Sequence, residues 1–235
     1  MMKKLFVFAI LIMSLSLTVF AQDTMMKDDK MMMKKEVTAA DAAKNALNVG
    51  AKMPTFSLSD ATGKTVSSAD LLKQGNLVVV FYRGAWCPYC NTYLRNLQKN
   101  ITEIKANGGN LVAISVETPD NSMKVADKNK IDFSVLSDTH LDVARQFGIV
   151  YQLDAATNEK YKGYGIDLVK QNGTEKPELP LSATYIVNKS GEITYAFLEP
   201  DYTKRAEPSV IIETLKKMKA DSMKMDKMDK MEKKN

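Results

Sequence analysis

The chain has 235 residues, of which 45% are hydrophobic, and its formal net charge at pH 7 is +5. This composition is typical of one globular domain with a core of its own. Lysine residues are interleaved with acidic residues along the chain, which offers no strongly basic segment, so we expect no nucleic-acid partner.

Residues 1–21 have the order of features of a secretory signal peptide. Lys3 and Lys4 precede an apolar run over residues 5–20, and Val19 and Ala21 provide the small or β-branched residues that stand before a cleavage site. The run is shorter than the ~20 residues that a bilayer-spanning helix needs. We therefore predict an exported, periplasmic protein without stable membrane insertion.

Two segments rich in methionine and lysine flank the predicted domain. Residues 22–49 form a linker that ends in a short helix with Thr38 as its N-cap, and residues 221–235 form a tail that is disordered or loosely helical. Taken together, the methionines of the two segments give M-x-M and M-x-x-M spacings, and thioethers suit Cu(I). A copper-binding carrier is therefore one alternative function.

Residues 50–220 alternate between strand and helix patterns, which predicts an α/β domain with helices on both faces of a sheet. The apolar run of residues 77–82 is typical of a central strand. In chain order we expect a hairpin over 56–66, a helix over 68–72, the strand 77–82, a long helix over 87–106, a strand over 111–116, a helix over 121–129, a strand over 133–136, a helix over 141–147, an irregular stretch over 154–180, a hairpin of strands 183–187 and 192–197, and a helix over 208–220.

The chain contains only two cysteines, Cys87 and Cys90, three positions apart. A disulfide across so short a loop constrains the unfolded chain little, so a purely structural role for a Cys87–Cys90 disulfide is disfavoured. Zinc needs four ligands, and beyond the two cysteines the chain offers a single histidine. We therefore predict neither a metal site nor a cofactor, and redox chemistry is the favoured use of the pair.

The pair stands where a predicted strand passes directly into a predicted helix, in the segment WCPYC of residues 86–90. Free amides and the helix dipole at a helix start stabilise a thiolate, which is the reactive form of cysteine. The spacing lets the second sulfur attack a mixed disulfide formed by the first. We predict Cys87 and Cys90 as catalytic residues, with Trp86 packing beside them and Arg83 lowering a thiolate pKa or holding an oxyanion.

Several segments together resemble the alkyl hydroperoxide reductase/thiol-specific antioxidant (peroxiredoxin) branch of the thioredoxin superfamily, in particular its members with a thioredoxin-type CxxC motif. The resemblance implies a thioredoxin-like fold with a central mixed sheet, and thiol-based reduction of peroxides or disulfides. The matching segments are 50–58 (GAKMPTFSL), 60–63 (DATG), 80–90 (VFYRGAWCPYC), 114–117 (ISVE), 133–138 (FSVLSD), 179–180 (LP), 183–185 (ATY) and 201–202 (DY).

The peroxiredoxin and thioredoxin patterns assign the two sulfurs differently. The peroxiredoxin pattern P-x-x-x-[TS]-x-x-C places Cys90 at the attacking cysteine, Cys87 at the threonine and Arg83 at the proline. The thioredoxin pattern makes Cys87 the nucleophile and Cys90 the buried resolving cysteine. Ser182 stands where one pattern expects a second arginine and the other a cis-proline, so we count it as a site-supporting residue. Which sulfur attacks first stays open.

We predict an exported antioxidant oxidoreductase that reduces peroxides or disulfides through a Cys87/Cys90 dithiol–disulfide cycle, with a thioredoxin-like electron donor as the partner that the resemblance implies. A thioredoxin-like protein disulfide oxidoreductase is the alternative enzyme, and a redox or copper carrier module is the alternative outside enzymology. Glu117, at the end of a strand on the same sheet edge as the motif, is expected at the rim of the site.

Overall fold

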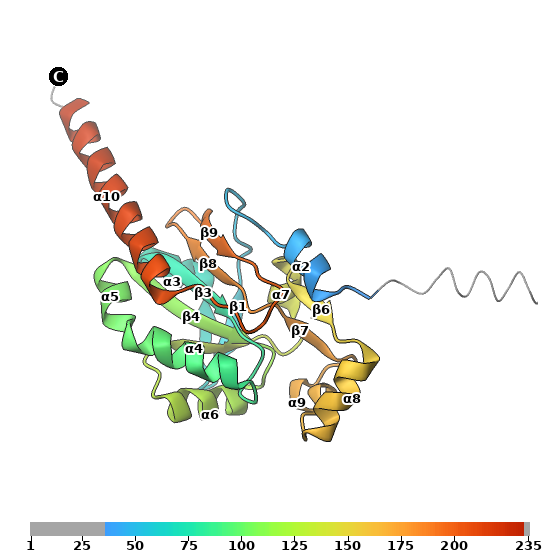
Figure 1. Cartoon of the computed structure of the whole chain (residues 1–235). Coiled ribbons are helices and arrows are strands. Elements are labelled where there is room, and N and C mark those ends of the chain that lie inside the picture. Colours follow the sequence, from blue (N-terminus) through green and yellow to red (C-terminus); the bar gives the residue numbers. More distant parts are fainter. Residues whose placement is uncertain (1–35, 233–235) are drawn as a thin grey trace, which may run out of the picture. The chain divides into compact units, whose positions relative to one another are not determined.

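The structure is a computed structural model that describes residues 36–232 (Figure 1). The predicted signal peptide and most of the predicted linker lie outside these residues. The described linker residues include the expected short helix α2 (Ala39–Asn45). Thr38 caps this helix as predicted: its hydroxyl accepts from the backbone N–H of Asp41, and the Asp41 carboxylate accepts from the backbone N–H of Thr38.

A seven-stranded mixed sheet forms the centre of the domain, in the order β2-β1-β5-β4-β3-β8-β9. Strands β3, β4 and β5 run parallel, and the outer strands pair antiparallel. The strands are β1 (Ser57–Asp60), β2 (Thr65–Ser67), β3 (Asn76–Phe81), β4 (Gly109–Ser115), β5 (Ser134–Ser137), β8 (Thr184–Val187) and β9 (Ile193–Phe197).

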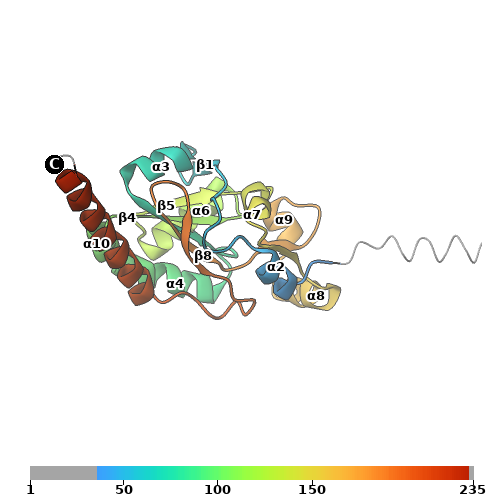
Figure 2. The same ribbon diagram turned by 90° about the horizontal axis from the view of Figure 1, so that it is seen from above.

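Helices cover both faces of this sheet, as predicted (Figures 1 and 2). Successive residues of β3 point to opposite faces and enter two separate cores. One core includes side chains of α2, α3 (Ser68–Gln74) and α7 (Asp142–Gln146). The other is covered by α4 (Pro88–Lys99), α5 (Ile101–Ala106), α6 (Pro119–Asn129) and α10 (Pro208–Glu232).

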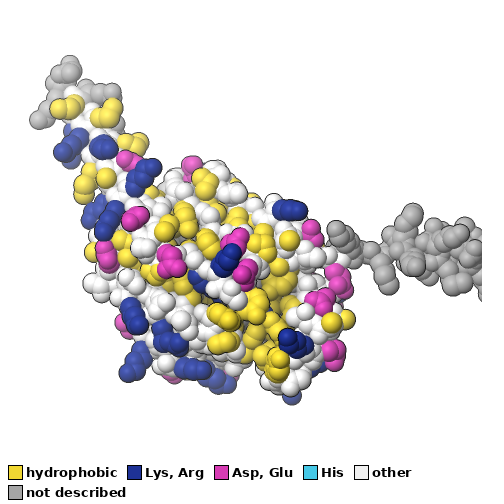
Figure 3. Space-filling model, in the orientation of Figure 1, with side chains coloured by type: hydrophobic (Ala, Val, Ile, Leu, Met, Phe, Trp, Pro, Cys, Tyr) yellow, Lys and Arg dark blue, Asp and Glu magenta, His cyan; other side chains and the backbone are white. Residues whose placement is uncertain are grey.

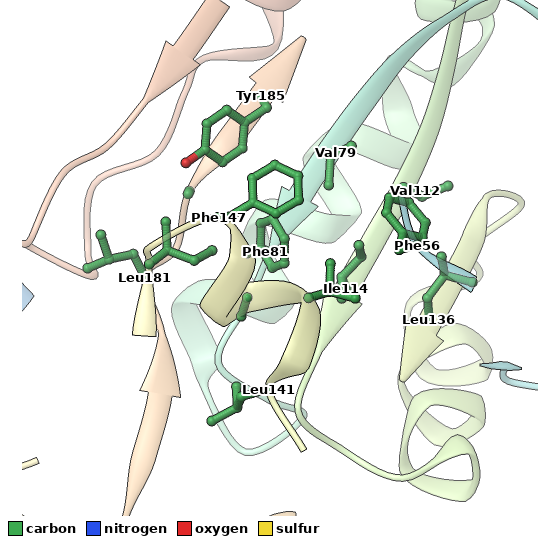
Figure 4. Close-up of a cluster of buried hydrophobic side chains, with 14 of the residues drawn as sticks. Phe56, Val79, Phe81, Val112, Ile114, Leu136, Leu141, Phe147, Leu181 and Tyr185 are labelled. Atoms are coloured by element: carbon green, nitrogen blue, oxygen red, sulfur yellow. The ribbon is translucent and has the colours of Figure 1, made fainter. Parts of the chain in front are cut away.

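Three aromatic rings lie at the centre of the first core (Figure 4). Phe147 contacts Phe81 and Tyr185, with ring centroids 5.1 and 4.9 Å apart. Phe81 is the last residue of β3, immediately before the loop that leads to the cysteines. The core therefore holds the end of β3 rigidly and fixes where the cysteine segment begins.

The prediction of one long helix over 87–106 was wrong, because Asn100 divides it into α4 and α5. Asn100 has non-helical backbone angles, φ −103° and ψ 4°, and its side-chain amide donates to the carbonyl of Asn96 at 2.8 Å. Asparagine side chains compete in this way with the helical hydrogen bonds of the backbone. The cysteines therefore lie at the start of the first and longer of the two helices.

The prediction of an irregular stretch over 154–180 was also wrong. It contains α8 (Ala155–Gly163), α9 (Leu168–Asn172) and strand β7 (Glu178–Pro180), which pairs with β6 (Val150–Gln152). Aspartate N-caps begin both helices: Asp154 accepts from the backbone N–H of Thr157, and Asp167 from that of Lys170. Helix α8 carries no buried residue, so it lacks the apolar periodicity by which a helix is recognised.

Helix α10 continues past residue 220, where the domain was predicted to end. Its first turns are buried through Ile211, Ile212 and Leu215. Beyond them, methionine side chains stand exposed between charged ones (Figure 3). The described part of the predicted tail is thus helical. In the described part of the chain, no helix combines the length and the apolar character that crossing a membrane requires.

Candidate active site

The two cysteines lie at the start of α4, directly beyond the central strand β3. Cys87 is the N-cap of α4 and Pro88 follows in the first turn, where its missing N–H costs no hydrogen bond. The backbone N–H of Cys90 donates to the Cys87 sulfur at 3.4 Å. Both cysteines are free thiols, and both are buried. The predicted pair is therefore present as a reduced dithiol at a helix N-terminus.

The structure shifts the pKa values of the two thiols in opposite directions. A hydrogen bond from the Cys90 thiol lowers the pKa of Cys87 to about 6; burial works against this, and the Cys90 amide and the charges of Arg83 and Arg205 add to it. Burial, together with the donation to Cys87 and its negative charge, raises the pKa of Cys90. The dithiol therefore carries its negative charge on Cys87, with Cys90 as the proton donor.

Arg83 is a buried cation, with only 2% of its surface exposed. Its guanidinium lies 4.0 Å from the ring centroid of Tyr202 and 4.9 Å from that of Trp86, and it donates to the hydroxyl of Tyr161. Within residues 36–232 we find no carboxylate paired with it. Aromatic rings and the Cys87 sulfur thus compensate the charge, an arrangement that leaves it free to act on an anion at the site.

Trp86 packs beside the motif, as predicted. Its ring meets that of Tyr161 edge to face, with centroids 5.6 Å apart. Gly84, two residues earlier, has φ +146°, and a Cβ there would lie 2.4 Å from the Trp86 ring nitrogen. The loop between β3 and α4 therefore requires glycine at this position in order to seat the tryptophan.

Glu117 lies deeper than the rim position expected for it. It follows β4, is 2% exposed, and its carboxylate accepts from the backbone N–H of Ala85 at 2.7 Å. Burial is the main cause that raises the pKa of Glu117 to about 7. The carboxyl group thereby fastens the loop that precedes Cys87, and it changes its charge near neutral pH.

Ser182 is buried just before β8, but its hydroxyl has no hydrogen-bond partner in the described residues. The described chain also contains no cis peptide bond, so the cis-proline geometry of the thioredoxin pattern is not reproduced here. The structure thus brings Arg83, Trp86, Cys87 and Cys90 together and places Ser182 without a polar contact to them. The catalytic roles of these residues stay predictions.

Arg205 is one of two site residues that sequence reasoning missed, the other being Tyr161. Arg205 lies in the loop between β9 and α10, and one terminal nitrogen of its guanidinium is 3.3 Å from the Cys90 sulfur, across 115 positions of sequence. No local pattern marks it, because a single arginine in a polar loop resembles any surface charge. Tyr161 was missed for a related reason, since it belongs to a helix that the sequence did not reveal.

A groove of about 1110 Å³ lies beside the motif, between α4 and the loop that carries Arg205. Its lining includes Tyr89, Tyr93, Lys204 and Arg205. No group of three or more histidine, cysteine, aspartate or glutamate side chains suited to a metal ion occurs in the described part of the chain. The arrangement is that of a dithiol with two guanidinium groups and an adjoining groove.

A thioredoxin-like sheet, with a polarised dithiol at a helix start, defines the class of thiol-dependent oxidoreductases. Residues 49–196 match the model of the AhpC/TSA family. The match spans more than half of the chain, and the chain belongs to this family. The resemblance inferred from the sequence motifs is therefore confirmed, and the protein is an enzyme of the peroxiredoxin type.

Individual relatives agree with this assignment. The chain is 34% identical to peroxiredoxin Bcp of Escherichia coli K12 over 105 residues, which cover 45% of this chain and 67% of that protein. It is 27% identical to a putative peroxiredoxin of Haemophilus influenzae over 153 residues, which cover 65% and 87%. Among solved structures, peroxidoxin BcpB of Mycobacterium tuberculosis superposes with a TM-score of 0.59 at 21% identity, covering 72% of this chain and 96% of that one. The structural likeness confirms the predicted fold.

Proposed function

We propose that the protein reduces hydroperoxides, with Cys87 as the attacking thiolate and Cys90 as the resolving thiol. The observation that supports this proposal is the pair of opposite pKa shifts: the pKa of Cys87 is lowered to about 6 and that of Cys90 is raised. At neutral pH the attacking form is therefore already present on Cys87. This order is that of a thioredoxin, on a chain of the peroxiredoxin family.

The cycle consumes one peroxide for each dithiol. The Cys87 thiolate attacks the terminal peroxide oxygen, the O–O bond breaks, and the alkoxide takes a proton to leave as an alcohol. Cys87 is then a sulfenic acid. The Cys90 sulfur attacks the sulfur of Cys87, the S–O bond breaks, and the hydroxide leaves as water with the proton from Cys90. The products are a Cys87–Cys90 disulfide, an alcohol and water.

Arg83 has a defined part in the first step. Its guanidinium is buried beside Cys87 and helps to lower the pKa of that thiol. Because no carboxylate of the described residues neutralises Arg83, the cation can also stabilise the charge that develops on the leaving oxygen. A positive charge at this point favours the transition state more than the neutral peroxide.

A protein disulfide is the second candidate substrate. One observation favours it: Tyr89, inside the motif, is 50% exposed and contacts the partly exposed Tyr202 edge to face, with ring centroids 5.8 Å apart. Exposed tyrosines next to a reactive thiol offer a docking surface for a partner chain. In this reaction Cys87 forms a mixed disulfide with the partner, and Cys90 displaces the partner as a thiol.

Stopped-flow fluorescence distinguishes the two candidate substrates. Trp86 is the only tryptophan of the chain and neighbours Cys87, so its emission reports oxidation of the pair. The reduced protein is mixed with hydrogen peroxide, an alkyl hydroperoxide or a disulfide-bonded protein, each in excess. We expect the fastest reaction with a hydroperoxide. A rate with both peroxides no higher than that of a free thiol would refute peroxide reduction, and fast reaction with the protein disulfide alone would establish the second candidate.

Single-cysteine variants test the order of attack. We expect Cys90→Ser to consume one equivalent of peroxide and Cys87→Ser to consume almost none. Stoichiometric peroxide reduction by Cys87→Ser would instead assign the attack to Cys90.

Arg83→Met is expected to slow peroxide reduction roughly tenfold, because the variant loses one charge-assisted interaction. Arg95→Met is its matched control, because Arg95 donates to Thr92 on α4 and to Asn129 on α6 and forms no hydrogen bond with either sulfur.

The electron donor and the compartment belong to the same proposal. A thioredoxin-like donor, the reductant of this enzyme class, would re-reduce the Cys87–Cys90 disulfide, and a donor-coupled peroxide assay with purified thioredoxin tests this. Export to the periplasm rests on residues 1–21, outside the described residues, and cell fractionation with and without them tests it. A Cu(I) titration with and without residues 22–35 and 221–235 tests the copper alternative.

A further inference from the structure

Arg205 occupies a defined position between the groove and the buried Cys90 sulfur. One terminal nitrogen of its guanidinium lies 3.3 Å from that sulfur. The other donates to the carbonyls of Tyr202 and Lys204, which fixes the orientation of the group. The cation also lies 5.7 Å from the ring centroid of Tyr93 on α4. The arginine is thus held against Cys90 from its own loop and from the helix that carries the cysteines.

The loop that carries Arg205 is itself fixed. Asp201 accepts from the backbone N–H and the hydroxyl of Thr203, at 2.9 and 2.7 Å, and closes a tight turn. Ala206, the next residue after Arg205, is 1% exposed and packs in the core beneath α4 and α10. The hydrogen bonds and packing of this loop therefore hold Arg205 in position to contact Cys90.

The resolving step requires a change of charge at Cys90. In the reduced dithiol, the negative charge of Cys87 and the hydrogen bond donated to it keep the proton on Cys90. Once Cys87 becomes a sulfenic acid or a mixed disulfide, that charge has gone. The Arg205 guanidinium and the backbone N–H of Arg83, which lower the pKa of Cys90, then act against burial and against the negative charge that Glu117 gains near neutral pH. Oxidation of Cys87 thus switches Cys90 towards its reactive form.

We propose that Arg205 is a catalytic residue of the second step, where it pairs with the Cys90 thiolate as that thiolate attacks Cys87. The inference rests on the proposed function in taking Cys87 as the first nucleophile. The Cys87–Cys90 bond forms while the bond from Cys87 to the departing hydroxide or thiolate breaks, and the departing group takes the proton that Cys90 gives up. Arg83 acts on the first sulfur, whereas Arg205, whose charge also helps to lower the pKa of Cys87, makes its hydrogen-bond contact with the second.

A neutral chromogenic disulfide, dithiodipyridine, separates the two steps without electrostatic attraction to Arg205. Attack by Cys87 releases a first thiopyridone, and attack by Cys90 on the resulting mixed disulfide releases a second. In Arg205→Gln we expect the first phase to stay within about twofold, and the second to slow about tenfold or more, as the loss of a charge-assisted contact implies. Lys204→Gln is the matched control, since Lys204 lines the same groove and touches neither sulfur.

A second measurement separates catalysis from a merely structural role. The rate of the second phase is followed against pH, and Arg205→Gln is expected to shift its midpoint upwards, whereas Arg205→Lys restores part of the wild-type rate. An unchanged second phase, or equal slowing of both phases with no shift in the pH profile, would overturn the inference. If the wild-type protein shows both phases but no peroxide reduction, the proposed function fails while the role of Arg205 stands.

Discussion

Replacing Cys90 by alanine or by serine tests what makes Cys87 acidic. The Cys90 thiol is the hydrogen-bond donor that contributes most to the low pKa of Cys87, ahead of the backbone amide, Arg83 and Arg205. Alanine removes this donor, whereas serine keeps a hydroxyl donor at the same position. Neither variant closes a disulfide, so the comparison isolates the hydrogen bond from the redox cycle.

The size of the effect follows from the hydrogen bond. The pKa of Cys87 falls from the ordinary 9.0 to about 6, which corresponds to about 4 kcal/mol in favour of the thiolate. A hydrogen bond to a charged group contributes about 1.5–3 kcal/mol, or roughly one to two pH units. We therefore expect Cys90→Ala to titrate near pH 7 to 8, and Cys90→Ser to stay near pH 6.

The assay is the rate of alkylation of the single remaining cysteine by iodoacetamide, measured between pH 4 and 10, an interval of about two units or more around the expected midpoints. Far-ultraviolet circular dichroism at each pH is the control that the fold persists. Equal midpoints near pH 6 in both variants would refute the hydrogen-bond explanation and assign the acidity to the helix N-terminus and the arginines. Midpoints near 9 in both would refute the activated thiolate itself.

Two further predictions concern stability. Burial raises the pKa of Glu117 from 4.5 to about 7, so up to about 3 kcal/mol of the free energy of unfolding is lost as the pH rises from 4.5 through 7. Urea unfolding at pH 5 and pH 8 should show this loss of stability in the wild type and not in Glu117→Gln. The same change of stability with pH in both proteins would contradict the prediction. Beyond Ala220, every α10 side chain that the structure describes is exposed, so truncation after Ala220 should leave the melting temperature unchanged. Truncation after Pro208 also removes the buried Ile211, Ile212 and Leu215 and should abolish cooperative melting. A large loss of stability on truncation after Ala220 would show that the helical tail stabilises the domain.

Much of the fold was predictable because its signals are local. The apolar run of β3, the Thr38 cap and the hairpin over residues 56–66 each depend on neighbouring residues, and the structure confirms them. Helix α8 and the pairing of β6 with β7 were not predictable in the same way. The first has no buried face, and the second joins strands whose paired residues lie 26 to 30 positions apart.

The sequence by itself determined the family, the dithiol and its place between a strand and a helix, because these are properties of contiguous residues. It left open which sulfur carries the charge. That was decided by groups that meet only in the folded chain: the Cys90 thiol turned towards Cys87, Arg83 buried among aromatic rings, and Arg205 brought to Cys90 across 115 positions. Acidity depends on burial and on charges within a few ångströms, and only tertiary structure sets both.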